Sequence, residues 1–188
     1  MRIVVQRCSR AEVRIDGEVV GRIGTGFVLL VGVTHSDTKQ DAEYLAKKVA
    51  GMRIFNDDEG KMNLALKDVQ GQVLSISQFS LHANPHKGNR PSFIKAAPPE
   101  MAEPLYNYFN TLLREEYGLV VETGRFGADM KVDFINDGPV TILIDSEDKL
   151  FFYYAFTAIL SISTITPLGR SRTAKAALAG GFTKKYWA

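Results

Sequence analysis

The chain has 188 residues, of which 45% are hydrophobic and 23% charged, and these values are typical of a globular protein with room for one real core. One cysteine, Cys8, excludes an intrachain disulfide, and the first residues contain no long apolar run of the kind found in secretory signals. We therefore expect a reducing, cytoplasmic location.

Net charge is +2, but it is unevenly distributed, since residues 1–149 carry 18 basic and 21 acidic residues. The excess of positive charge comes from the end of the chain. A nucleic-acid footprint spread over the whole main domain is therefore excluded, and any RNA contact there must be local.

The first half of the chain predicts strands and one helix. Residues 2–7 predict a strand, 11–23 a hairpin turning at Asp16-Gly17, and 27–33 a buried strand. A helix follows, with Ser36 or Asp37 as its cap and apolar residues at 42, 45, 46 and 49 on one face. Residues 72–81 predict a further strand.

The second half predicts one more helix and the last strands. The helix is expected within 99–117, with Pro104 in its first turn and Gly118 at its end. Two strands follow, and a hairpin through Gly138-Pro139 joins the second of them to the run "VTILID". Helices that separate groups of strands predict an α+β fold with a curled, mostly antiparallel sheet and two helices.

The composition changes near residue 149. Residues 150–169 are 20 uncharged residues, and only basic charges follow them. We therefore place a domain boundary there, with 1–149 as the main domain and 150–188 as an atypical extension. The extension is open to three interpretations: a read-through or frameshifted tail, an extra packed element, or a membrane-associating segment, which its serines, threonines and Pro167 disfavour.

Few residues are placed for metal or phosphate chemistry. None of His35, His82 and His86 has a partner at metal-ligand spacing, so we expect neither a metal site nor a cofactor. Between Val69 and Pro99 there is no acidic residue, and the basic residues of that stretch give a loop suited either to plain solvation or to a phosphate contact, with Lys87 and Arg90 as the best candidates.

The stretch "SISQFSLHA" at 75–83 concentrates hydroxyl, amide and imidazole groups. Taken alone, Ser77, Gln78 and Ser80 are most simply polar residues of a strand. Ser80 and His82 would share one face of an extended strand, but a serine-histidine pair without an orienting carboxylate is a weak sign of a nucleophile.

Residues 1–149 resemble the D-aminoacyl-tRNA deacylases along their whole length, through "GRIGTGFVLLVGV", "MRIFNDDEGKMN", "SQFSL", "KGNRPSF", "TGRFGADM" and "NDGPVT". The family's Ser-Gln-x-Thr motif corresponds to 77–80, with Ser80 in place of threonine, and its Asn-x-Gly-Pro-Val-Thr motif to 136–141. The tail from Leu150 matches nothing in the family.

The resemblance implies a homodimer of small β-barrel-like subunits that hydrolyses D-aminoacyl-tRNA, and also glycine mischarged on alanine tRNA. It implies a cis Gly138-Pro139 bond that one subunit inserts into the partner's site as a wall against L-amino acids. Its implied catalytic segment is Ser77, Gln78, Phe79 and Ser80, and its implied substrate-binding residues are Asn136, Gly138, Pro139, Val140, Thr141 and Met130.

Two mechanisms stay open at this stage. Either backbone N–H groups near Phe79 and Ser80 hold the developing oxyanion while water attacks, or Ser80 is a covalent nucleophile. Because no general base is visible beside Ser80, we favour the first. Ser77 and Gln78 would shape the adenosine pocket, and Met130 would pack on the adenine. The alternative function is a non-catalytic module that binds the tRNA 3′ end.

Overall fold

The computed structural model describes residues 1–86 and 88–148. The sequence-based predictions for the extension fall outside these residues, so the boundary after residue 149 stays a prediction. Neither helix described below has the length and hydropathy that a bilayer crossing requires, a statement that covers only the described residues.

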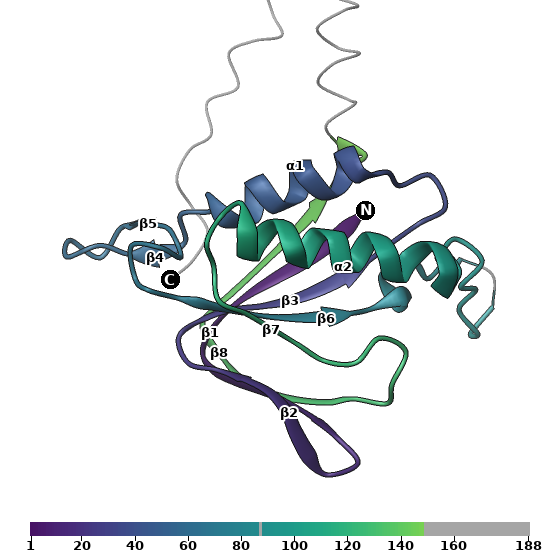
Figure 1. The fold of residues 1–188 in the computed structure, drawn as a ribbon, viewed down its shortest axis with the longest axis horizontal. Coiled ribbons are helices and arrows are strands. Elements are labelled where there is room, and N and C mark those ends of the chain that lie inside the picture. The colour runs from purple at the N-terminus through teal and green to yellow at the C-terminus, as the bar shows by residue number, and fades with distance from the viewer. Residues whose placement is uncertain (87, 149–188) are drawn as a thin grey trace, which may run out of the picture. The chain divides into compact units, whose positions relative to one another are not determined.

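A long strand, β1 (Arg2–Ile15), organises the main sheet. One edge of β1 pairs antiparallel first with β3 (Gly26–Gly32) and then with β2 (Glu18–Ile23). Its other edge pairs along nearly its whole length with β8 (Lys131–Asp145). Strands β6 (Gln72–Ser77) and β7 (Val121–Thr123) continue the sheet in parallel from β3. The curled, barrel-like and mostly antiparallel sheet that the sequence predicts is thereby confirmed (Figure 1).

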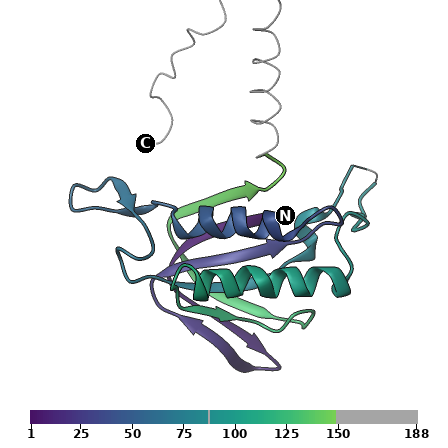
Figure 2. The same ribbon diagram turned by 45° about the horizontal axis from the view of Figure 1, so that its top comes forward.

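Both helices cover one face of the sheet, α1 (Lys39–Ala50) beside α2 (Pro99–Glu115) (Figures 1 and 2). Their apolar faces bury Leu45, Phe109 and Leu113 completely against β1 and β3. A second apolar cluster, which includes Val13, Leu74 and Ile76, fills the inner side of the curl. The small hairpin of β4 (Phe55–Asn56) and β5 (Met62–Leu64) stands apart from the main sheet.

Among the predictions for turns and helix ends, the hairpin turn at Asp16-Gly17 is confirmed and three others need correction. The turn at Asp16-Gly17 has φ values of 52° and 85°, the left-handed pair that a type I′ hairpin requires. The cap of α1 is Thr38, not Ser36 or Asp37, because Thr38 and Asp41 form a reciprocal capping box. Pro99, rather than Pro104, occupies the first turn of α2.

The third correction concerns Gly138-Pro139, which does not turn a hairpin. The segment 131–145 is one continuous strand along β1, where Asn136 pairs with Cys8 and Thr141 with Gln6. Four residues of β8, 137–140, therefore stand opposite the single residue Arg7. These extra residues leave the ladder as a large bulge, and the peptide bond between Gly138 and Pro139 within it is cis.

Candidate active site

A cavity lies where the end of β6, the start of α2 and the 126–130 loop meet. Its volume is about 580 Å³, which falls in the range of small-molecule sites. The walls are mostly apolar, with Val31, Ile76 and Ala102 among them, and they include Ser77, Gln78, Phe79 and Met130. The structure thus brings together four of the predicted site residues from two distant parts of the sequence.

The strand prediction for 72–81 is wrong at its end, and the difference shapes the cavity. Strand β6 stops at Ser77, and Phe79–His82 form a 3₁₀ turn, η1. The last bond of the ladder with β3 is donated by the Gln78 N–H to the Val31 carbonyl at 2.8 Å, and the turn begins at the next residue. Because the first N–H groups of a helical turn have no partner within it, those of Phe79 and Ser80 have no acceptor inside η1.

The serine-histidine pair, which the sequence supported only weakly, does not form. The turn carries His82 into the interior, where it is 7% exposed, while Ser80 stays half-buried. Burial lowers the pKa of His82, so its imidazole is neutral at physiological pH. The hydroxyl of Ser80 instead accepts a 2.6 Å hydrogen bond from Nε2 of Gln78, an amide that has no basic character.

Cys8 is also unsuited to act as a nucleophile. Its side chain is fully buried in the inner apolar cluster. Burial raises the pKa of its thiol to about 11, so almost none of it is thiolate near pH 7. Within the described residues, no three His, Cys, Asp or Glu side chains gather as metal ligands.

One wall of the cavity is held by a buried tyrosine that the sequence patterns did not indicate. The hydroxyl of Tyr106 on α2 donates to the Ser75 carbonyl on β6 at 2.8 Å. Its ring packs at 6.0 Å between centroids against Phe126, which leads the loop that carries Met130. Only contacts across the folded chain reveal this role, because Tyr106 fits the apolar face of an ordinary amphipathic helix.

The second predicted group, the residues of "NDGPVT", lies on the β8 bulge and does not line this cavity. Asn136 braces the bulge, since its Oδ1 accepts from the Val140 N–H at 2.9 Å and its Nδ2 donates to Thr141 Oγ1 at 3.0 Å. Gly138 and Pro139 are both exposed at the tip. Gly138 has a φ of 131°, a conformation that other residues rarely adopt.

Arg7 supports the bulge from below, and sequence reasoning missed it. It is only 6% exposed although it is charged. Its Nε donates to the Asp137 carbonyl at 2.9 Å, and its Nη1 donates to the Ile54 carbonyl at 2.6 Å. A lone arginine in a strand has no local sequence feature that predicts such a role.

Comparison with known proteins places this architecture in a family. Residues 4–145 match the family model described as D-Tyr-tRNA(Tyr) deacylase. The chain is 56% identical over 147 residues to a D-aminoacyl-tRNA deacylase of Bacillus cytotoxicus, covering 78% of this chain and all of the relative. It is 58% identical over 146 residues, with the same coverage, to the enzyme of that name in Brevibacillus brevis.

A solved structure shares the fold at a greater distance. The structure titled c-Myc DNA Unwinding Element Binding Protein superposes with a TM-score of 0.73 at 41% identity. The match covers 77% of this chain and 98% of that one. The matched length of the curated relatives is close to the length of the region that the structure describes.

Proposed function

The chain belongs to the D-Tyr-tRNA(Tyr) deacylase family, and on that premise we propose that it hydrolyses the ester between a D-amino acid and the terminal adenosine of tRNA. Free amino acid and tRNA are the products. The substrates include glycine mischarged on alanine tRNA, because glycine has no side chain for a chiral filter to reject. The observation that carries the proposal is the apolar cavity beside the exposed start of η1.

The cavity suits a nucleoside joined to a small acyl group. Apolar walls and the sulfur of Met130 offer packing for an adenine ring, while Ser77 and Gln78 supply polar groups at the edge. The ester carbonyl would then lie at the start of η1, within reach of the N–H groups of Phe79 and Ser80.

Main-chain donors, rather than a serine nucleophile, supply the catalysis we propose. An oxyanion hole stabilises the charge that develops on the carbonyl oxygen, and one such donor is typically worth about 2.7–4 kcal/mol. Ser80 is a poor nucleophile here, because among the described residues its hydroxyl is paired with an amide and not with a base. Water would attack the ester, which is already activated by the neighbouring ribose hydroxyl.

Rejection of L-aminoacyl groups is proposed to come from the bulge of a second subunit. Gly138 and Pro139 are exposed and do not line their own chain's cavity, so they would reach a cavity only in a partner. Their carbonyls would accept the substrate ammonium and occupy the space that an L side chain needs. The homodimer is part of this proposal, and so are the binding roles of Asn136, Val140 and Thr141, which hold the bulge in shape.

The test is a deacylation assay with D-tyrosyl-tRNA, L-tyrosyl-tRNA and glycyl-tRNA(Ala). We expect release of D-tyrosine and glycine, and no release of L-tyrosine above the spontaneous rate. Binding of D-tyrosyl-tRNA without release of the amino acid would instead identify a non-catalytic module for the tRNA 3′ end. Equal hydrolysis of the D and L substrates would contradict the chiral filter.

A further inference from the structure

Aromatic residues of the cavity wall have exposed basic residues close to them in the chain. We define the rim as Phe79, Phe93, Arg90, Lys95 and Arg125. Phe79 and Phe93 line the cavity yet are 59% and 42% exposed, and their rings meet edge to face at 5.0 Å between centroids. Apolar rings this exposed at the edge of a site are unusual on a surface that water alone contacts.

Three residues of the rim, Arg90, Phe93 and Lys95, lie on one loop, and hydrogen bonds hold the main chain of this loop in place. Asn84 and Ser92 form an antiparallel bridge with hydrogen bonds of 2.7 and 2.9 Å. At its base, the Thr34 hydroxyl donates to the Lys95 carbonyl at 2.5 Å, and Nε2 of His35 lies 2.9 Å from the Ile94 carbonyl. Phe93, a lining residue, and the main chain at Lys95 are therefore held next to the cavity.

The cations of the rim have no acidic partner. Arg90, Lys95 and Arg125 are exposed, and none of them forms an ion pair or side-chain hydrogen bond with another described residue. Their positions in the chain bracket the cavity, since Lys95 precedes the lining residue Ala96 and Arg125 precedes the lining residue Phe126. Lys95 and Arg125 therefore lie next to the cavity wall in the chain, on two segments that are distant in sequence.

We infer that the rim binds the single-stranded nucleotides that precede the terminal adenosine of the RNA substrate. Exposed rings flanked by cations are the combination that holds single-stranded nucleic acid, because bases stack on the rings while phosphates meet the charges. Duplex RNA would not suit the rim, since its bases are already stacked on one another. The inference rests on the proposed function for the identity of the RNA, but the geometry of the rim stands independently of the hydrolysis.

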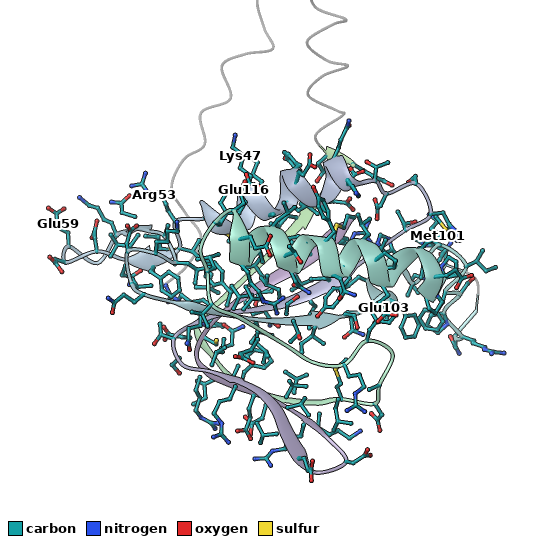
Figure 3. The ribbon with its side chains drawn as sticks, in the orientation of Figure 1. Lys47, Arg53, Glu59, Met101, Glu103 and Glu116 are labelled. Atoms are coloured by element: carbon teal, nitrogen blue, oxygen red, sulfur yellow. The ribbon has the colours of Figure 1, made fainter. Side chains whose placement is uncertain are left out.

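Binding of uncharged RNA tests the rim without requiring any hydrolysis. The probes are an acceptor-stem hairpin with a four-nucleotide single-stranded 3′ end and the same hairpin with a blunt end. Their binding is measured by fluorescence anisotropy across a series of salt concentrations. The variant is the triple change Arg90→Ala, Lys95→Ala and Arg125→Ala. Its matched control removes three exposed cations elsewhere, Lys47→Ala, Lys48→Ala and Lys67→Ala; Lys47 is labelled on α1, away from Met101 at the start of α2 (Figure 3).

We expect the wild-type protein to prefer the hairpin with the single-stranded end. The rim variant should lose that preference, and the slope of log affinity against log salt should fall by about 2, at about 0.7 per phosphate contact on a single strand. The control should keep both the preference and the slope. Changing only Arg90→Lys and Arg125→Lys should also preserve them, because a phosphate accepts either cation.

Equal affinity of the wild-type protein for the two hairpins would overturn the inference, as would equal losses in the rim variant and its control. A wild-type protein that prefers the single-stranded end but releases no D-tyrosine from D-tyrosyl-tRNA would support the rim while refuting the proposed deacylation. A failure of the rim inference can therefore be distinguished from a failure of the proposed deacylation.

Discussion

The Nε of Arg7 donates to the main-chain carbonyl of Asp137 at 2.9 Å, so a buried cation on β1 holds the base of the bulge that carries Gly138 and Pro139. The same guanidinium also donates to the Ile54 carbonyl at 2.6 Å. Arg7 thereby couples the bulge to a segment far from it in sequence, through hydrogen bonds that only a forked donor can make together.

Replacing Arg7 by lysine should therefore loosen the bulge although the charge is kept. We expect Arg7→Lys to lower the free energy of unfolding by about 2 kcal/mol, because hydrogen bonds of a charged, buried group are lost. Urea unfolding measures this change, and deacylation of D-tyrosyl-tRNA should fall with it. The control is Arg10→Lys, whose 3.7 Å pair with Asp133 is exposed and should change stability by less than about 0.5 kcal/mol. Unchanged unfolding of Arg7→Lys would refute the supporting role.

Gly138→Ala should damage activity more than stability. Gly138 has a φ of 131°, and a Cβ added there would lie 2.7 Å from Val140 Cγ2 and 3.0 Å from Arg7 Nη2. The cost, about 1–3 kcal/mol for a strained backbone, can be relieved by a shift of the exposed bulge. We expect a folded protein whose kcat/KM on D-tyrosyl-tRNA falls at least tenfold.

The matched control for that change is Gly17→Ala. Gly17 also has a positive φ, 85°, but no atom lies within 4 Å of an added Cβ. Strain alone should then cost about 1–2 kcal/mol of stability and leave kcat/KM unchanged. Similar kcat/KM values for the two variants would show that the shape of the bulge does not matter to catalysis.

Ser80→Ala separates the two mechanisms. If main-chain donors hold the oxyanion, loss of the hydroxyl removes only the partner of Gln78 Nε2, and kcat/KM should fall about tenfold, or about 1.4 kcal/mol. Mass spectrometry of the wild-type protein quenched during turnover should show no acylated Ser80. A trapped acyl-serine, or a folded Ser80→Ala variant with no activity at all, would establish covalent catalysis instead.

His82 predicts a pH dependence of stability. Burial lowers its pKa in the folded state below the ordinary value of 6.5, so the unfolded chain binds the proton more tightly. The stabilising contribution of the neutral imidazole is complete above pH 6.5 and is lost as the pH falls below that value. Urea unfolding at pH 7.5 and pH 5.5 should show a larger loss for the wild-type protein than for His82→Gln. Equal losses of stability in the two proteins would mean that groups other than His82 govern stability between pH 5.5 and pH 7.5.

Truncation tests the predicted domain boundary. Because relatives are matched over their full length within 147 residues, a chain ending at Lys149 should fold and deacylate D-tyrosyl-tRNA at close to the full rate. Circular dichroism and the deacylation assay measure the two properties. An unfolded or inactive truncated protein would place residues 150–188 within the functional domain.

Local patterns in the sequence locate most of the elements and identify the family. Apolar periodicity located α1 and α2, Asp16-Gly17 located the hairpin turn, and the motifs at 77–80 and 136–141 identified the deacylase family, since such patterns depend on neighbours along the chain. How these parts meet depends on contacts between segments that are far apart in the chain. The tertiary structure ended the ladder between β3 and β6 with the bond from the Gln78 N–H to the Val31 carbonyl, let η1 follow, and buried His82 while Ser80 stays half-buried. It also made Gly138-Pro139 a bulge instead of a hairpin, because Gln6 and Cys8 of β1 pair with β8 on the two sides of it while Arg7 bonds to its base. Contacts between residues about 130 positions apart leave no local pattern in the sequence.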